Sequence, residues 1–579
     1  MNTARRATGE GKKAQARLIC RLATAADRRQ IYHWRHQVYA LELGQHAPDP
    51  SGALNDELDA GNLYLVLARD DRVRAFISLT PPGLGRYSID KYLARESCPF
   101  AFDDGLWEIR LLTVDPQRRG GPDASILIFA AGRWIEEHGG RHVVLIGRSD
   151  LVAYYRKFGV EPFAAPVRSG RVSYVPMHGD LSAILRLARG RYRRGLDRLR
   201  EKVEWSLDFP FWGEQKCEHG GAFFKAIGET FDTLDRRTEI ISADVLDAWF
   251  DPAPGVAQAL KLDPNWLART SPPTHAEGLL ATLAERRALP ATSIVPGAGS
   301  SDLIFRAFHA WLKPGSRVLL IEPSYGEYAH LLGTVIGADV QTLQLDPRDD
   351  FNLDLEAWSR RLSDGFDLAV LVNPLNPTGQ AFPAAALQPL IAAAPATTRL
   401  WIDEAYAEYA GSSTSLESLA CRLPNLVVCK SLSKVYALSG LRAAYLVAHP
   451  QTAAELRRRT PPWPISLPAQ IAAVRALSDP EHYAACYRRT HELQAELADG
   501  LETLGLHPIR GVINAVLLRL PDGCPSAPQL TRRLAEQGIF VRDLSSLSAV
   551  FGERFLRISV RPATEQQRLL DGLASALRA

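Results

Sequence analysis

The stretch VVCKSLSKVYALSGLRAAYL, residues 427–446, places Lys434 just after two serines, Ser431 and Ser433, at the end of a short apolar run. Val427 to Cys429 are typical of a strand buried in a parallel sheet, where nearly continuous apolar runs occur. A buried cation without a partner costs free energy, so this lysine needs solvent, a partner or a chemical task. For a lone lysine, a strand-end side chain that reaches solvent is the simplest interpretation. The rest of the chain has to decide.

Similar apolar runs recur before this stretch and predict the fold of the second half of the chain. They are SRVLLIEP (316–323), FDLAVLVNP (366–374), TRLWIDEAY (398–406) and NLVVCKS (425–431). Helical or turn-rich segments separate them, and this alternation predicts a mainly parallel sheet covered by helices on both faces. In such sheets, ligands bind at the carboxyl ends of the strands.

Unusual polar side chains follow these runs, at the predicted strand ends. In chain order they are Gly299, Ser300 and Ser301; Tyr325 and Tyr328; Asn376; Asp403 and Tyr406; and Ser431, Ser433, Lys434 and Arg442. Each alone has a structural explanation: a Gly-Ser pair commonly caps a helix, and an aromatic side chain commonly packs in a core. Together they supply an anion cradle at a helix N-terminus, an aromatic platform, a buried carboxylate, phenols and an amine. Pyridoxal phosphate needs all of these.

The segments NPLNPTG (373–379), DEAYAEY (403–409) and SLSKVYALSGLR (431–442) resemble those of fold-type I aminotransferases. The similarity is greatest to histidinol-phosphate aminotransferase and threonine-phosphate decarboxylase, and it covers roughly residues 235–575. It implies an α/β fold over 206–579, with a large, mainly parallel seven-stranded sheet domain at about 290–455. The flanking segments would form a smaller α+β domain. It also implies bound pyridoxal phosphate, a small amino-acid-like substrate and a homodimer.

The resemblance also assigns roles to residues. Lys434 would form the Schiff base and act as the base, Asp403 would pair with the pyridine nitrogen, and Tyr325 would stack on the ring. Asn376 and Tyr406 would bind the ring's phenolic oxygen. The phosphate would be held by Gly299, Ser300, Ser301, Ser431, Ser433 and Arg442. Arg557 in ERFLRISVRP (553–562) would bind the substrate carboxylate, and Arg542 is a weaker candidate for a second anionic group.

One segment departs from that family pattern. The family has a tyrosine that reaches the partner subunit's cofactor phosphate, and LARTSPPTHAEGL (267–279) has Thr270 or Ser271 in its place. The reaction also stays open, since the same cofactor residues serve transamination, decarboxylation and carbon–carbon bond formation.

Residues 18–183 form a separate mixed α/β domain in this interpretation. WRHQVYALELG (34–44), LWEIRLLTV (106–114) and YYRKFGVEP (154–162) resemble the GNAT acyltransferases, in particular their autoinducer-synthase-like branch. The resemblance implies an acyl-CoA or acyl-carrier-protein thioester, with the acyl carrier protein as a partner. The turn at Arg118, Arg119 and Gly120 would bind its pyrophosphate, Tyr155 would be the general acid, and Glu108 a base or an amine ligand.

The pyrophosphate turn is distorted, because Pro122 lacks an amide donor. An active acyltransferase and a degenerate binding or structural module therefore both stay open.

The arginine-rich stretch 184–205 also has leucines at 185, 187, 196 and 199, and it predicts a solvated linker helix or a packing helix, with a nucleic-acid arm as the alternative. The formal net charge of +3 does not favour nucleic acid or an anionic membrane.

Seven scattered cysteines show no metal-binding spacing and indicate free thiols. No secretory signal and no membrane-spanning run is present, so we expect a cytoplasmic location. The sequence thus predicts a bifunctional enzyme. The alternative from another class of function is a regulator in which one domain only senses its ligand.

Overall fold

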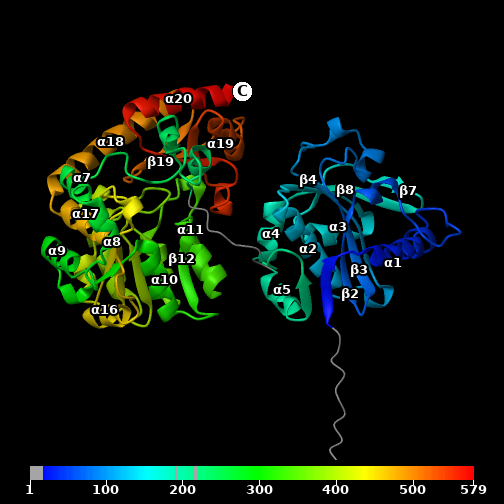
Figure 1. Ribbon diagram of the computed structural model, residues 1–579, viewed down its shortest axis with the longest axis horizontal. Helices are drawn as coiled ribbons and strands as arrows, with labels where there is room; N and C mark the ends of the chain where they lie inside the picture. The colour runs from blue at the N-terminus through cyan, green and yellow to red at the C-terminus, as the bar shows by residue number, and fades with distance from the viewer. Residues whose placement is uncertain (1–16, 190–191, 213–219, 579) are drawn as a thin grey trace, which may run out of the picture. The chain divides into compact units, whose positions relative to one another are not determined.

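The structure, a computed structural model, describes residues 17–189, 192–212 and 220–578 (Figure 1). The chain divides into two compact units, Met1–Gln215 and Lys216–Ala579. The six cysteines of the described ranges are free thiols. Within those ranges, no helix combines the length and the apolar character that crossing a bilayer requires.

A nine-stranded sheet forms the centre of the first unit. Its strand order is β6-β8-β5-β4-β3-β2-β1-β9, and β7 pairs with β8. The strands are β1 (Leu18–Leu22), β2 (Leu63–Arg69), β3 (Arg72–Thr80), β4 (Leu106–Val114), β5 (His142–Arg148), β6 (Glu161–Pro162), β7 (Val167–Ser169), β8 (Val172–Asp180) and β9 (Val203–Ser206). Helix α2 (Asp123–Glu137) packs its apolar side into the core that also holds Leu65 and Ile77. The neighbouring pairs are antiparallel, except that β4 runs parallel to β5 and β1 parallel to β9.

The arginine-rich stretch packs on the first unit, which corrects the linker predicted for 184–205 and agrees with the packing-helix alternative. It forms α4 (Leu181–Arg189) and α5 (Arg193–Arg200), with residues 190 and 191 outside the described ranges. Leu185 and Leu196 are buried in the core of the first unit, and β9 then pairs with β1 in its sheet. The stretch folds back onto the first unit because burying its leucines stabilises the fold by more than solvation of its charged side would stabilise a free helix.

The second unit contains the predicted seven-stranded sheet, called here the large sheet, in the order β11-β17-β16-β15-β14-β12-β13. Its strands are β11 (Ile294–Gly297), β12 (Arg317–Glu322), β13 (Asp339–Gln344), β14 (Leu368–Val372), β15 (Arg399–Asp403), β16 (Leu426–Ser431) and β17 (Ala444–Ala448). β13, β12, β14, β15 and β16 are parallel to one another, and β17 is antiparallel to both of its neighbours. Every residue of β14 and β16 is buried, as expected for strands covered on both faces. The predicted α/β class with a mainly parallel sheet is confirmed for this unit.

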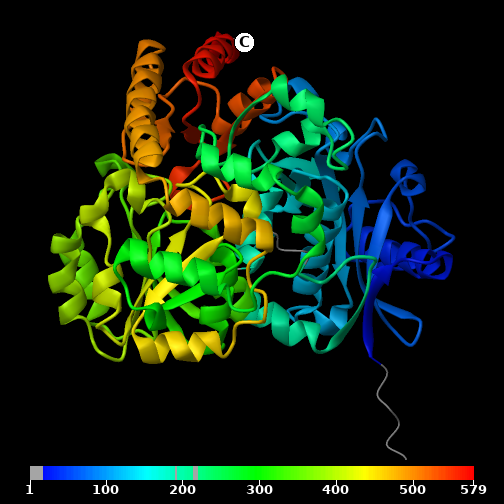
Figure 2. The same cartoon turned by 60° about the vertical axis from the view of Figure 1, so that its left-hand side comes forward.

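A five-stranded sheet, called here the small sheet, lies beside it in the order β10-β20-β21-β19-β18. Its strands are β10 (Ile241–Ala243), β18 (His507–Ile509), β19 (Ala515–Arg519), β20 (Ile539–Asp543) and β21 (Phe555–Ser559). Helices α18 (Pro480–Thr503), α19 (Ala527–Ala535) and α20 (Ala563–Arg578) cover it, and Leu497, Leu530 and Leu573 share its core (Figures 1 and 2).

Candidate active site

A cavity of about 270 Å³ lies where the parallel strands of the large sheet end, and we call it the strand-end cavity. Side chains from both sheets of the second unit line it. They include twelve of the residues predicted from the sequence: Ser300, Ser301, Tyr325, Asn376, Asp403, Tyr406, Ser431, Ser433, Lys434, Arg442, Arg542 and Arg557. Gly299 precedes the first of them as the N-cap residue of helix α10 (Ser300–Trp311). The structure therefore brings the predicted cofactor and substrate residues of this unit together.

One end of the cavity is suited to an anion. Gly299 has φ +88°, and a Cβ atom there would lie 2.4 Å from Nη2 of Arg442, so this guanidinium lies against the helix N-terminus. The hydroxyls of Ser433 and Ser324 are buried there without a hydrogen-bond partner among the described residues. Free amides, two available hydroxyls and a guanidinium are the groups that bind a phosphate.

A buried carboxylate lies deeper in the cavity. Asp403, at the end of β15, is 4% exposed, and its Oδ2 accepts a hydrogen bond from the Tyr328 hydroxyl at 2.7 Å. Trp401 Nε1 donates to the same hydroxyl at 2.8 Å, and the backbone amide of Ala405 donates to Oδ1 at 3.0 Å. Burial raises the pKa of Asp403 to about 6, and the bond from Tyr328 acts against that rise. The carboxylate is therefore mostly ionised at neutral pH.

The backbone that carries Lys434 is held by phenols. Three consecutive carbonyls, of Lys434, Val435 and Tyr436, accept hydrogen bonds from tyrosine hydroxyls at 3.2, 2.8 and 3.4 Å. The donors, in the same order, are Tyr409, Tyr487 and Tyr483. Since the last two lie on α18, the lysine loop is anchored by a helix that also packs on the small sheet.

The small sheet supplies two arginines to the cavity. Arg557 on β21 is buried, and it donates to Asn376 Oδ1 and to the carbonyl of Asp244, both at 2.9 Å. No carboxylate of the described residues lies within 4.0 Å of its nitrogens, and burial lowers its pKa to about 10. Arg542 faces it in register on β20. Two like charges placed directly opposite each other destabilise a sheet, so this pair is suited to an anionic ligand.

These residues fit pyridoxal phosphate. Ser300, Ser433 and Arg442 would hold its phosphate, Asp403 would face its ring nitrogen, and Lys434 would carry it. When bound, the cofactor supplies an electron sink for reactions at the carbon bearing the substrate's amino group.

Some residues at the cavity were not predicted from the sequence. They are Val245, Leu246, Ser324, Gly326, Val372, Ala405, Leu544 and Leu547 in its lining, and Asp247 in contact with Lys434. Tyr328 was expected at the sheet edge, but its bond to Asp403 was not predicted. Ser324 could have been found, because it directly precedes Tyr325 at a strand end. Nothing in the sequence brings Asp247 to Lys434, from which it is 187 residues away.

The first unit has a cavity of its own, and it lies where two parallel strands separate. β4 and β5 pair only as far as Ile109 and Leu145 and diverge beyond them. A cavity of about 70 Å³, the split-strand cavity, opens there and is lined mainly by apolar side chains, with Tyr155 and Arg110 as its polar residues. The Tyr155 ring packs against Gly147, where a Cβ atom would lie 2.6 Å from its Cε2. Burial raises the pKa of Tyr155 to about 12, so its hydroxyl keeps its proton at neutral pH.

The predicted pyrophosphate turn precedes α2. Gly120 has φ +83°, while Arg118 and Arg119 are exposed. The Arg119 guanidinium is paired with Glu42 at 2.7 Å, and the Gly121 amide donates to the Arg118 carbonyl at 3.1 Å. Some of the hydrogen-bond donors that the resemblance assigns to a bound anion therefore already bond to other groups of the protein.

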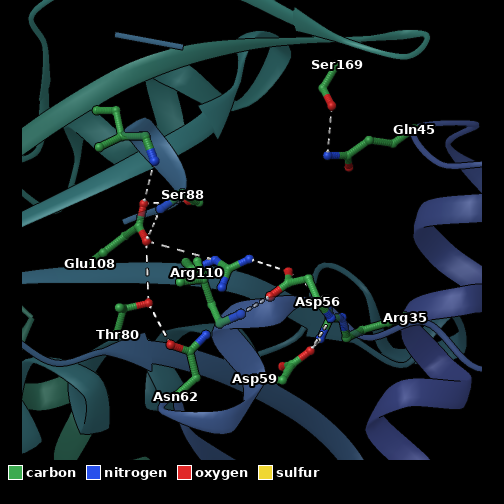
Figure 3. Close-up of polar contacts among 12 residues, drawn as sticks. Arg35, Gln45, Asp56, Asp59, Asn62, Thr80, Ser88, Glu108, Arg110 and Ser169 are labelled. Carbon is green, nitrogen blue, oxygen red and sulfur yellow. Dashed lines mark hydrogen bonds and ion pairs between the residues drawn. The ribbon is translucent and has the colours of Figure 1, made fainter. Parts of the chain in front are cut away.

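The structure places Glu108, expected as a base or an amine ligand, in a buried hydrogen-bond network. It is fully buried, does not line the split-strand cavity, and accepts hydrogen bonds from the amides of Ser88 and Ile89 at 2.8 and 3.1 Å (Figure 3). The hydroxyls of Ser88 and Thr80 also donate to it. Burial raises its pKa, against the effect of Arg110. The hydrogen bonds that its carboxylate oxygens accept therefore hold the segment around residue 88 against β4.

Comparison with known proteins assigns the second unit to a protein family. Residues 245–577 match the family model described as aminotransferase class I and II. Histidinol-phosphate aminotransferase 1 of Cupriavidus pinatubonensis is 33% identical over 313 residues, which are 53% of this chain and 80% of that protein.

Two solved structures show the same fold. One is histidinol-phosphate aminotransferase from Sinorhizobium meliloti in complex with pyridoxal-5'-phosphate, at 23% identity and a TM-score of 0.54, covering 63% of this chain and 99% of that one. The other is L-threonine-O-3-phosphate decarboxylase from Porphyromonas gingivalis, at 22% identity and a TM-score of 0.52, covering 59% of this chain and all of that one. On the extent of the family match, this chain belongs to the class I and II aminotransferases, with the fold-type I architecture of pyridoxal-phosphate enzymes.

Proposed function

We propose that the second unit catalyses pyridoxal-phosphate-dependent amino transfer from an amino-acid-like substrate. The main support for this proposal is that Lys434 and Asp403 line the same cavity, and that the end of this cavity near Gly299 is suited to an anion. Lys434 is the residue that bonds the cofactor and afterwards moves a proton at the reacting carbon. Asp403, ionised at neutral pH, holds the proton of the ring nitrogen. Asn376 and Tyr406 orient the ring from the side, and Tyr325 covers it.

The substrate of this proposal carries a carboxylate or phosphate and a second anionic group. Arg557 takes the first, because a buried guanidinium that contacts only neutral acceptors has the most to gain from an anion. Arg542, opposite it in the strand register, takes the second.

Borohydride reduction and peptide mapping test the assignment of Lys434. Purified protein incubated with pyridoxal phosphate should yield the pyridoxyl group on Lys434, and a Lys434→Ala variant should yield none. A label on another lysine would refute the assignment.

Decarboxylation and carbon–carbon bond formation at the same site are the second candidates, since the fold is shared with a decarboxylase. Mass spectrometry of reactions with dianionic amino acids and keto acids separates them. Amino transfer yields a keto acid and a new amino acid, decarboxylation yields an amine and carbon dioxide, and bond formation yields a heavier product.

A homodimer completes this proposal. The segment that precedes Thr270 exposes Leu262 and Trp266, which are 77% and 42% exposed, and Trp463 is 54% exposed. The backbone amide of Trp463 donates to the Thr274 carbonyl at 2.8 Å, so Trp463 lies beside the segment that holds Thr270. Large apolar side chains gathered in this way mark an interface, and the family's partner-reaching segment lies here. Light scattering that shows an active monomer would refute it.

The first unit is proposed as an acyltransferase acting on an amine, with acyl-CoA or an acyl carrier protein as donor. The split-strand cavity supports this, because an apolar slot beside a protonated phenol can hold an acyl chain and protonate a leaving thiolate. In full-length Lys434→Ala protein, acyl transfer should persist, and Tyr155→Phe should reduce it. If neither acyl-CoA nor acyl carrier protein binds, the unit is a structural module. The expected cytoplasmic location stays a prediction.

A further inference from the structure

Glu327 is a buried residue that bonds to two side chains of the strand-end cavity without lining the cavity itself. It lies on the short helix α11 (Gly326–Ala329) and is 4% exposed. Its Oε2 atom accepts hydrogen bonds from the Ser301 hydroxyl at 2.7 Å and from the Tyr325 hydroxyl at 3.1 Å. Ser301 and Tyr325 belong to the cavity lining, and Glu327 does not. One carboxylate oxygen therefore joins the anion end of the cavity to the aromatic side chain that we expect to cover the cofactor.

The bond from Ser301 attaches one end of α10 to α11. It takes up the one hydrogen of the Ser301 hydroxyl, so that hydrogen is not available to an anion in the cavity. The backbone amide of Ser301 is a different donor, because it lies in the first turn of α10, where amides have no partner within the helix. Glu327 therefore holds this turn through a side chain and leaves its amide for the anion.

The ring of Tyr325 is fixed at two places. Its hydroxyl is bonded to Glu327, and its ring packs edge-to-face on the ring of Tyr328, with the centroids 5.9 Å apart and the planes at 81°. Tyr328 is itself fixed, because its hydroxyl donates to Asp403 at 2.7 Å. Ordering a side chain when a ligand binds costs conformational entropy, and a ring that is already fixed avoids this cost.

We infer that Glu327 is a positioning residue of the strand-end cavity, which fixes the Tyr325 ring against the cofactor site and the first turn of α10 at the anion end. The inference deepens the proposed function and rests on it in one respect, namely that pyridoxal phosphate binds in this cavity. Glu327 is assigned no contact with cofactor or substrate, because it does not line the cavity. It acts through Tyr325 and Ser301.

A double-mutant cycle measures the connection between Glu327 and Tyr325. Cofactor-free, full-length protein is titrated with pyridoxal phosphate, and binding is followed by absorbance. Tyr325→Phe keeps the ring but loses the bond, and Glu327→Leu removes the acceptor. Each should weaken binding about two- to tenfold, the range for one hydrogen bond. In the Glu327→Leu background, Tyr325→Phe should have no further effect, because the bond that it removes is already absent.

Pyridoxal, which lacks the phosphate, separates the two ends of the cavity. Tyr325→Phe should weaken the binding of pyridoxal and of pyridoxal phosphate by the same factor, because the ring is common to both. Ser301→Ala should weaken the binding of pyridoxal phosphate about two- to tenfold and leave that of pyridoxal unchanged, because only the phosphate reaches the anion end. An equal loss for both ligands in Ser301→Ala would overturn the link to the anion end, and so would no loss for either.

Glu417→Leu is the matched control. Glu417 is 6% exposed, and its oxygens accept hydrogen bonds from the Tyr445 hydroxyl at 2.8 Å and the Ser415 hydroxyl at 3.2 Å. This variant loses the same kinds of bond as Glu327→Leu, but none of these three residues lines the strand-end cavity. Its melting temperature should fall as that of Glu327→Leu does, while its affinity for pyridoxal phosphate stays that of the parent protein.

Three results overturn the inference. An unchanged affinity in Glu327→Leu, or an equal loss in Glu417→Leu, would show that Glu327 only stabilises the fold. The same factor for Tyr325→Phe in both backgrounds would show that the hydroxyl acts without Glu327. If Glu327→Leu does not fold, Glu327→Met replaces it in the cycle, since a flexible methionine fills irregular space in a core. Failure of the proposed function is a different result, because the parent protein itself would then not bind pyridoxal phosphate.

Discussion

Replacement of Tyr328 by phenylalanine should shift the pH range over which the protein binds pyridoxal phosphate. The Tyr328 hydroxyl is fully buried, and Trp401 Nε1, which can only donate, occupies its oxygen at 2.8 Å. Its own hydrogen must therefore go to Asp403 Oδ2 at 2.7 Å. A hydrogen bond to a charged group contributes about 1.5 to 3 kcal/mol. At about 1.4 kcal/mol per pKa unit, its loss should raise the pKa of Asp403 from about 6 by about one to two units.

The size of the effect on cofactor binding follows from the fraction of Asp403 that is ionised. At pH 7 this fraction is about nine-tenths with a pKa of about 6, and between about one-half and one-tenth after the shift. Titration of cofactor-free protein should therefore show about two- to tenfold weaker binding of pyridoxal phosphate to Tyr328→Phe at pH 7, and equal binding at pH 9. Because the folded pKa lies above the ordinary carboxyl value, stability is lost as the pH rises through it, and in the variant that loss should extend to about pH 8.

Trp401→Phe is the control, because it keeps the phenol that donates to Asp403. It should lower stability by about 1 to 3 kcal/mol while its binding profile stays near that of the parent protein. Two results for Tyr328→Phe would refute the role of the hydroxyl. One is an affinity for pyridoxal phosphate that falls at the same pH as in the parent protein, and the other is a loss of affinity that is the same at every pH.

Three further predictions follow from other contacts. Arg557→Lys keeps the charge but loses the bidentate fork, so kcat/KM for substrates with a free carboxylate should fall about ten- to a hundredfold, with the cofactor spectrum intact; an equal loss for amines that lack the carboxylate would move this contact to Arg542. Gly299→Ala should displace Arg442 and weaken cofactor binding about tenfold, whereas Gly315→Ala, with a similar φ of +85° but nothing within 4 Å of its new Cβ, should not; similar affinities would show that Arg442 is not needed. A chain of residues 1–215 should melt cooperatively, but residues 1–185 should not, because they lack the buried Leu196, Val203, Phe209 and Phe211, each worth about 1.5 to 3 kcal/mol; a cooperative transition in the shorter chain would contradict this account of the core.

The residues around the strand-end cavity could be predicted because two simple rules converge there. Apolar runs of strand length mark the parallel strands, and polar side chains that follow such runs meet at one edge of the sheet. Lys434, Asp403 and Asn376 each follow a run of this kind. Tyr328 also follows such a run, although its bond to Asp403 was not predicted. Asp247 obeys neither rule, since its contact with Lys434 depends on how distant segments pack.

The linker predicted for 184–205 is wrong, and Glu108 makes contacts that the resemblance did not imply. Many arginines in 184–205 indicated an exposed linker, although Leu185 and Leu196 are enough to fold this stretch onto the first unit. Glu108 appeared available for chemistry because it lies in a strand that the resemblance made catalytic, yet the amides of Ser88 and Ile89 take up its oxygens. The burial of one carboxylate depends on loops whose course the sequence does not reveal.

The two walls of the strand-end cavity have separate origins along the chain. The cofactor wall is made by the ends of the large-sheet strands, and the opposite wall by Val245, Leu246, Arg542, Leu544 and Arg557. Arg557 of the second wall also donates to Asn376 of the first at 2.9 Å, so changes at Arg557 reach the cofactor wall. A library restricted to Val245, Leu246, Arg542 and Leu544 would search for new substrates without changing that contact.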